Sequence, residues 1–289
     1  MRTSTSPSFS DLLEELPSLA AQHARTTAVY GERERIAREI VNSSHFTQTD
    51  GARETLGGFG EIALPYFRMG AVDTLDLFGL DELIIFSFYW TNRNRYRRAA
   101  DIGANLGLHS ILMSKCGWEV DAYEPDPAHA AVLKRNLALN RSTSVNPIEA
   151  AVSDRPGTLE FVRVLGNTTS SHLAGAKPNA YGALERFPVR VETIGAIMSK
   201  VDFVKMDAEG QEKTILLGTT AAHWEGTDMM LEVGSAENAR AILGHLQRLG
   251  LNAFAQKIGW NEVKSLSDIP TTYKDGSLFI SHRATMQWE

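Results

Sequence analysis

The sequence contains one cysteine, no long apolar run and no excess of basic residues. Cys116 alone excludes an internal disulfide and every metal site that needs several cysteines, which fits a reducing cytoplasm. No stretch approaches the roughly eighteen apolar residues of a membrane span. The first twenty residues also lack the basic start and apolar run of a signal peptide. These absences predict a cytoplasmic protein without a membrane segment.

The charge balance weighs against a nucleic-acid partner. Twenty-nine basic and 35 acidic residues give a net charge of −6, which repels a phosphate backbone unless a local basic patch intervenes. The clearest patch consists of Arg93, Arg95, Arg97 and Arg98, and a solvated helix end explains it better than an RNA site. With 43% hydrophobic and 22% charged residues, the composition is that of an ordinary globular protein, for which an enzyme is the natural expectation.

The N-terminal region differs in pattern from the rest. From Asp11 to about Val41, leucines at helical spacing predict helices that Pro17 interrupts. Residues 42–60 are rich in Ser, Thr and Gly and indicate a loop or hinge, and the apolar run 77–89 leads into the core. We therefore expect an N-terminal helical cap over residues 1–75 and a catalytic α/β domain over residues 76–289.

Strands and helices alternate in the second region. A strand ending at Asp101, a helix over 106–115 and a strand over 119–124 form a βαβ start, and Asp126 with Pro127 is placed to begin the next helix. The other expected strands are 147–152, 158–164, 187–191, 201–207, 228–233, 251–255 and 277–281, with a loop over 166–186 and helices after Gln211 and over 236–249. This order predicts an α/β fold whose sheet is closed by a hairpin.

The run from Asp101 to Gly107, DIGANLG, turns a strand sharply into a helix. Its glycines tolerate unusual backbone angles and let a ligand approach, as in loops that bind nucleoside cofactors. An NAD site would need the spacing G-x-G-x-x-G. Counting from Gly103, this chain has Asn105 and Leu108 at the second and third glycine positions, so a pyrophosphate would lack its closest backbone approach.

Glu124 ends the second strand, 23 residues after Asp101, where a carboxylate can accept both hydroxyls of a ribose. S-Adenosylmethionine has a ribose, an amino-acid tail and a sulfonium cation but no phosphate. A glycine-poor loop flanked by acids therefore suits it better than NAD, with Asp101 facing the ammonium group. The alternative is a generic strand, turn and helix with an exposed Glu124, and the joint occurrence of loop and acid favours the cofactor.

Lys205, Asp207 and Glu209 stand at a period of two at the carboxyl end of a predicted strand. Residues of that period share a face, so the three could converge on the hydroxyl of a substrate. The alternative, in which Lys205 and the acids only pair with one another, stays nearly as strong. Asp207 is the first choice for the group that accepts a proton, and Glu209 is the second.

Other polar residues are weaker candidates. Glu232 ends the next strand and would approach Asp207 if the two strands are neighbours. Such carboxylates could hold Mg²⁺ or share hydrogen bonds, and we expect no metal. His172 and Tyr181 lie in the expected polar loop, where a contact with an acceptor is conceivable but a surface position is the more common outcome.

With these residues, the chain resembles the FkbM family of methyltransferases over roughly residues 78–233. The matching runs, in order, are LDELI at 80–84, DIGANLGLHS at 101–110, YEPD at 123–126, AVSD at 151–154 and KMDAEG at 205–210. The first run is weak, but the ordered set is specific. The N-terminal helices and the last forty or so residues carry no motif of the family.

The resemblance implies a seven-stranded Rossmann-like class I methyltransferase sheet with an N-terminal helical extension and S-adenosylmethionine as cofactor. The implied cofactor contacts are Asp101, Gly103, Asn105, Gly107, Glu124, Pro125 and Asp154, the last near the adenine. Asp207 and Glu209 would lie in the active site, beside Lys205. The usual reaction of the family is O-methylation, which implies a small-molecule, natural-product or saccharide acceptor. A non-catalytic cofactor-binding protein and an RNA methyltransferase remain as alternatives, and an oligomer is possible.

Overall fold

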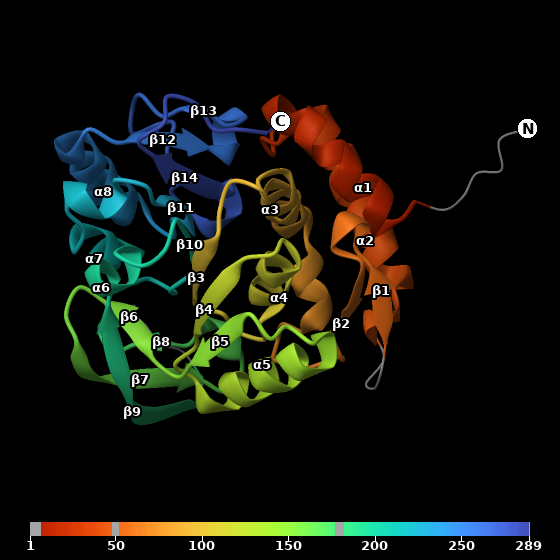
Figure 1. Cartoon of the computed structure of the whole chain (residues 1–289), viewed down its shortest axis with the longest axis horizontal. Coiled ribbons are helices and arrows are strands. Elements are labelled where there is room, and N and C mark those ends of the chain that lie inside the picture. The colour runs from red at the N-terminus through yellow and green to blue at the C-terminus, as the bar shows by residue number, and fades with distance from the viewer. Residues whose placement is uncertain (1–6, 48–51, 177–181, 289) are drawn as a thin grey trace, which may run out of the picture.

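The computed structural model describes residues 7–47, 52–176 and 182–288, and its centre is an eight-stranded mixed sheet (Figure 1). The strands run in the order β13-β12-β14-β11-β10-β3-β4-β5. Their bounds are β3 Arg98–Ile102, β4 Glu119–Tyr123, β5 Val145–Ile148, β10 Phe203–Met206, β11 Asp228–Glu232, β12 Asn252–Ala255, β13 Asn261–Glu262 and β14 Ser277–Ser281. The α/β fold is therefore confirmed.

The number of strands differs from the expected seven. The eighth strand, β13, has only two residues and pairs antiparallel with β12 at the edge of the sheet, so the sequence offered no periodic pattern to mark it. In the centre, β10 lies between β3 and β11 and is parallel to both. The carboxyl ends of these three strands therefore meet at one edge, where open α/β sheets bind ligands.

Helices cover both faces of this sheet (Figure 1). One face carries α3 Leu80–Thr91, α4 Leu108–Lys115 and α5 Pro127–Asn140, and the other carries α6 Ile194–Met198, α7 Glu212–Leu217 and α8 Ala236–Leu249. Successive strand residues alternate between the two cores: Phe203 packs in the core of Phe88, and Val204 in that of Ile242. Among the described residues, no helix has the length and apolar character needed to cross a membrane.

The N-terminal region packs against α3. The expected break at Pro17 is confirmed, because α1 (Phe9–Glu15) gives way to the 3₁₀ helix η1 (Leu16–Gln22) before α2 (Ala28–Ser43). Phe46 stacks on Phe78 with 4.5 Å between ring centroids, within the same core as α3. The segment expected to be a loop over 42–60 contains further elements: η2 His45–Thr47, β1 Arg53–Thr55 and η3 Gly57–Phe59, followed by β2 Glu61–Ala63 and η4 Thr74–Phe78. The domain boundary at residue 75 stays a prediction.

A smaller sheet with the strand order β6-β9-β7-β8 lies at the lower left of Figure 1. Its strands are β6 Ala151–Ser153, β7 Gly157–Val164, β8 His172–Leu173 and β9 Leu184–Thr193, with η5 Thr168–Ser170 between β7 and β8. The single strand expected over 147–152 is wrong, because the chain turns between β5 and β6 and the two strands belong to different sheets. The loop expected over 166–186 is also too long, since it includes β8 and the start of β9.

The rest of the C-terminal region joins the main sheet. Short 3₁₀ helices occur at η6 Ala221–Trp224, η7 Gln256–Ile258 and η8 Tyr273–Asp275. The expected hairpin is confirmed in part, because β12 and β14 pair antiparallel, with Phe254 opposite Phe279. The tail then returns to the N-terminal region, where the Trp288 ring lies 5.1 Å from that of His23.

Asp126 begins α5, as the sequence predicts. Its side chain accepts the Ala128 N–H at 2.8 Å, and Pro127 occupies the first helical turn. Asp126 is 1% exposed, and Arg163 on β7 donates to both of its carboxylate oxygens, at 2.7 and 2.5 Å. Burial alone would raise the pKa of Asp126, but the Arg163 hydrogen bonds hold that pKa below its ordinary value. One carboxylate thus starts a helix and ties the smaller sheet to it.

We predict that Asp126→Ala lowers the free energy of unfolding by about 2 to 4 kcal/mol, because it removes both the helix cap and the partner of Arg163. Asp126→Asn keeps an oxygen for the cap but loses the negative charge, so its loss should be smaller. Urea unfolding followed by circular dichroism measures both variants. Equal losses would show that the cap contributes nothing.

Candidate functional site

Three residues of the loop after β3 have left-handed backbone conformations. Their φ angles are 78° at Gly103, 49° at Asn105 and 85° at Gly107. A Cβ at Gly103 would lie 1.8 Å from the carbonyl oxygen of Asp207, so only glycine fits between the two strand ends. Gly107 begins α4, where a Cβ would press on Leu133 at 3.1 Å. The loop after β3 therefore lies directly against the segment after β10.

Glu124 lies beside this loop and is 6% exposed. Its Oε2 accepts the Asn105 N–H and its Oε1 accepts the Asp126 N–H, both at 2.8 Å. Burial raises the pKa of Glu124 to about 7, although the two backbone hydrogen bonds act in the opposite direction. Each carboxylate oxygen keeps the capacity to accept another donor such as a hydroxyl. The interpretation of Glu124 as a merely exposed acid is therefore wrong.

Asp101 is fully buried beneath the loop and does not reach the pocket wall. Ser110 donates to its Oδ2 at 2.5 Å, and its Oδ1 has no hydrogen-bond partner in the described part of the chain. The Lys205 Nζ lies 3.8 Å from this Oδ1 and 3.9 Å from Asp207. Burial alone would lower the pKa of Lys205, but Asp101 and Asp207 raise it above its ordinary value. Lys205 is thus a charged group between two acids.

The segment after β10 leaves the extended conformation. β10 ends at Met206, and Glu209 has a φ of 47°. The carboxylate of Glu212 closes this turn by accepting two of its backbone N–H groups, at 3.0 and 3.2 Å. A period of two aligns side chains only in extended backbone, so the expected line of Lys205, Asp207 and Glu209 is wrong. The two acids still reach one pocket, and the lysine lies outside its wall.

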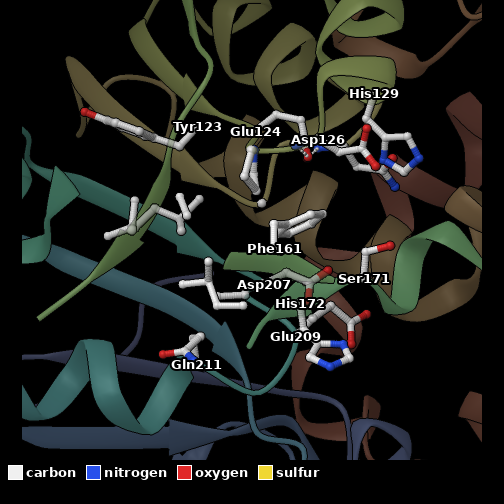
Figure 2. A pocket seen from close by; sticks show the side chains of 18 of the residues that line it. Tyr123, Glu124, Asp126, His129, Phe161, Ser171, His172, Asp207, Glu209 and Gln211 are labelled. Atoms are coloured by element: carbon white, nitrogen blue, oxygen red, sulfur yellow. Dashed lines mark hydrogen bonds between the residues drawn. The ribbon is translucent and has the colours of Figure 1, made fainter. Parts of the chain in front are cut away.

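One pocket joins the loop after β3, the end of β4 and the segment after β10. It is lined by parts of residues 102–105, 123–126, 150–152, 168–173 and 207–211, together with His129 and Phe161. Figure 2 shows Glu124 and His129 on one side of the pocket and Asp207 and Glu209 on the other. The pocket therefore brings the predicted ribose acid and the predicted proton acceptors into one space.

The predicted cofactor residues divide into two groups. Gly103, Asn105, Glu124 and Pro125 line the pocket, whereas Asp101, Gly107 and Asp154 do not. Asp154 follows β6, and its carboxylate lies 3.5 Å from the exposed side chain of Arg155. Its role near an adenine stays a prediction.

A short strap, residues 69–71, holds the segment 166–173 against one side of the pocket. The Ala71 N–H donates to the Gly166 carbonyl and the Thr168 N–H donates to the Met69 carbonyl, each at 2.9 Å. A Cβ at Gly70 would lie 2.2 Å from the Gly166 carbonyl oxygen, so the two backbones approach very closely. Chain that precedes the main sheet therefore helps to place a wall of the pocket.

His172 does not have the surface position that its loop context suggested. It lies in β8, is 3% exposed and lines the pocket near Asp207 and Glu209 (Figure 2). The ring Nδ1 lies 2.9 Å from the Ser170 carbonyl oxygen. Tyr181, the other loop residue singled out from the sequence, lies outside the described residues.

Sequence reasoning missed several other residues of the pocket wall. His129 on α5 contacts Thr168, with 2.9 Å between Nε2 and Oγ1, and Phe161 and Gln211 complete the wall. His129 and Phe161 lie on ordinary helix and strand patterns, so no local signal distinguishes them, and Gln211 precedes α7 directly after the predicted motif. The pairing of the smaller sheet brings Phe161 and the residues around β8 to the pocket, where Thr168 meets His129.

The strands β10 and β11 are neighbours, which places Glu232 near Asp207 as the sequence allowed. Both residues line a second, small cavity behind the pocket. Within the described residues, no group of three or more His, Cys, Asp or Glu side chains is arranged to hold a metal ion.

A glycine turn after the first parallel strand, a buried acid after the second and acids after β10 define a Rossmann-like, S-adenosylmethionine-dependent methyltransferase. Comparison with known families supports this class, because residues 101–250 match the methyltransferase FkbM domain. That match covers more than half of the sequence, and the chain belongs to the FkbM methyltransferase family.

A curated relative, the methyltransferase sdnD of Sordaria araneosa, is 28% identical over 158 residues, which covers 43% of this chain and 61% of that protein. The match thus spans about three fifths of that relative's length. A methyltransferase from Agrobacterium tumefaciens has a TM-score of 0.40 at 9% identity, covering 80% of this chain and 70% of that chain. An O-methyltransferase from Bacillus cereus in complex with SAH has a TM-score of 0.34 at 12% identity, covering 68% and 78%. Structural similarity at this level carries no argument about substrate.

We predict that affinity for S-adenosylhomocysteine falls as the pH drops below about 7, by up to about tenfold per pH unit. Below this pH Glu124 is mostly protonated and loses an acceptor for the ribose hydroxyls. Titration calorimetry from about pH 5.5 to pH 8.5 measures the effect, with Glu124→Gln as the matched variant that cannot ionise. Glu124→Gln should bind weakly at every pH, and Glu124→Ala should lose about 1 to 3 kcal/mol above pH 7. A flat wild-type profile would contradict the prediction.

Proposed function

We propose that this chain transfers the methyl group of S-adenosylmethionine to a hydroxyl oxygen of a small molecule, a natural product or a saccharide. The contact between Gly103 and Asp207 supports the proposal most strongly, because the glycine loop after β3 and an accessible carboxylate border one pocket. Ligands of open α/β sheets bind at this edge, beyond the carboxyl ends of the strands.

The pocket fits a nucleoside cofactor that has no phosphate. Glu124 offers its remaining lone pairs to two ribose hydroxyls, and Asn105 Oδ1 is a buried oxygen without a hydrogen-bond partner among the described residues. The described residues of the pocket wall include no Lys or Arg that could pair with a pyrophosphate. When bound, S-adenosylmethionine supplies a methyl group on a positively charged sulfur, which keeps the carbon–sulfur electron pair when the methyl group leaves.

The other predicted cofactor residues support this site from outside its wall. Asp101 fixes the loop from beneath through its hydrogen bond from Ser110, and Gly107 lets the loop enter α4. We propose Asp154 as the residue near the adenine, because the resemblance to the FkbM family implies that position.

Asp207 accepts the proton of the acceptor hydroxyl. Its side chain is 36% exposed and borders the pocket, so a hydroxyl can reach it directly. Lys205 provides a positive charge 3.9 Å behind it. Glu209 lies on the same side of the pocket and is the second candidate for the proton acceptor. Loss of the proton makes the oxygen a better nucleophile.

The remaining wall suits a small hydroxyl-bearing acceptor. Thr169, Ser171 and His172 offer hydrogen-bonding groups, and Phe161 offers an apolar surface. Such a mixture fixes the orientation of a small ligand and excludes water. Alignment and exclusion of water can supply much of the rate of an in-line methyl transfer.

A small acceptor is better supported than RNA. The arginines at the start of β3 and just before it lie at the opposite end of the strand from the pocket. Arg98 pairs with Glu119 at 3.2 Å, and Arg93 stacks 4.7 Å from the centre of the Trp90 ring. These contacts provide no basic path into the pocket. The acids at Asp207 and Glu209 argue against a protein that binds the cofactor without using it.

Methyl-labelled S-adenosylmethionine tests the proposal. The protein is incubated with it and a fraction of small metabolites, and in parallel with total RNA. We expect label in a small molecule, and mass spectrometry of the product should show an O-methyl group. Label in RNA alone would favour an RNA methyltransferase, and cofactor binding with no labelled product would favour a non-catalytic protein.

We predict that Asp207→Asn lowers turnover by about 10² to 10³-fold, because the amide keeps the shape of the side chain but cannot accept the proton. Calorimetry should show less than about a twofold change in cofactor affinity, which separates chemistry from binding. Glu209→Gln is the comparison and should lose less turnover. Wild-type turnover in Asp207→Asn would remove this residue from the mechanism.

A further inference from the structure

A second, small cavity lies behind the pocket at the ends of β10 and β11. Its polar lining residues are Glu82, Lys205, Asp207, Glu232 and Ser277. Its volume is about 10 Å³, at the lower limit for a single water molecule. Only Asp207 belongs to the lining of both spaces, so this side chain connects the cavity to the acceptor pocket.

The strand register brings the two carboxylates together. Met206 on β10 pairs in parallel with Leu231 on β11, so Asp207 and Glu232 follow at the same level of the sheet. On the other side, Glu232 is opposite Ser277 of β14. Glu232 thus lies in a fixed position between the end of β10, which leads to Asp207, and strand β14.

The groups that face Glu232 carry more negative than positive charge. Glu82 on α3 forms an ion-pair contact with His109, with 3.0 Å between Oε2 and Nε2, and Tyr273 approaches from η8. Lys205 is the cation among the described groups that act on Glu232, and it already lies between Asp101 and Asp207.

The remaining acid near Glu232 is held by other partners. Asp81 on α3 accepts from the Tyr30 hydroxyl at 2.9 Å and also from Arg25 and Gln256. These partners direct its carboxylate away from the cavity that Glu232 lines. Two adjacent carboxylates that share one cation cannot both carry full charge at low cost when one of them, Glu232, lines only the small inner cavity.

We propose that Asp207 and Glu232 form a carboxyl pair in which Glu232 carries the proton and, as a hydrogen-bond donor, positions the charged Asp207 toward the acceptor. The inference rests on the proposed function, because it assigns a task to the proton acceptor named there. Glu232 is a positioning residue, since it lines the inner cavity and not the pocket.

The electrostatics agree with this arrangement. Burial raises the pKa of Glu232 well above its ordinary value, and the charges of Asp207 and Glu82 raise it further, whereas Lys205 acts in the opposite direction. A neutral Glu232 can donate to Asp207, but an ionised one would repel it. A hydrogen bond between the two carboxyl groups therefore forms only while Glu232 holds the proton.

Glutamine at position 232 separates this role from a purely structural one. Glu232→Gln copies the shape and the donor of a protonated acid but cannot ionise, whereas Glu232→Ala removes the donor. Glu237→Gln on α8 is the matched control, because Glu237 is an exposed acid paired with Lys213 at 2.7 Å. Circular dichroism confirms that each variant is folded.

The first measurement needs no methyl transfer. Infrared spectra of the cofactor-free protein are recorded at neutral pH in a Glu124→Gln background, because the Glu124 pKa of about 7 would otherwise add a second protonated carboxyl group. They should show a protonated-carboxyl band that is lost in Glu232→Gln and kept in Glu237→Gln. If Glu232→Gln does not fold, the pH titration of this band in Asp207→Asn replaces it. Removing the charge of Asp207 should move the titration to lower pH, and an unchanged titration would overturn the pair.

The second measurement is turnover against pH. Glu232→Gln should stay within about threefold of wild type at neutral pH and lose the alkaline decline that ionisation of Glu232 causes, whereas Glu232→Ala should fall about tenfold or more. Equal losses in both variants, or an unchanged infrared band in Glu232→Gln, would overturn the inference. If the band behaves as expected but no hydroxyl compound is methylated, the carboxyl pair stands and the proposed function fails.

Discussion

The backbone contact between Gly103 and Asp207 determines how the turns after β3 and β10 meet at the pocket. β3 and β10 are adjacent parallel strands with Asp101 opposite Lys205, so the turns after them leave the sheet at the same level. Any side chain at Gly103 would separate these turns. One steric constraint therefore holds the loop after β3 beside the Asp207 carboxylate, the two groups that we propose face the cofactor and the acceptor.

The charges beneath this contact form a second constraint. Asp101 is fully buried, and such a group is tolerated only where a partner compensates it. Lys205 supplies that compensation while also standing behind Asp207. The same cation thus stabilises the buried Asp101 beneath the loop and sets the charge beside Asp207. A substitution of Lys205 would therefore affect both the stability of the fold and the electrostatics of the pocket.

The sequence predicts the features whose signals are local. α8 and β14 have the expected bounds, and Asp126 caps α5, because long periodic runs and capping residues mark them directly. The joint position of Glu124 and Asp207 also follows from sequence, since both end parallel strands. The smaller sheet does not follow in the same way. β8 has two residues, and the pairing of His172 with Val162 joins segments that no local pattern connects. The wall contributed by Phe161 depends on that pairing, since Phe161 is opposite Leu173, which explains why it was missed.

The strap at residues 69–71 has a consequence for how related enzymes can diverge. It binds residues 166–168 mainly through hydrogen bonds between backbone groups, which most amino acids can make equally well. Substitutions along 166–173 therefore keep these backbone hydrogen bonds, while they reshape the inner surface of the pocket. Substitutions in this segment can therefore change the shape of the pocket without a new anchor for the segment, and under the proposed function they would change the preference for an acceptor.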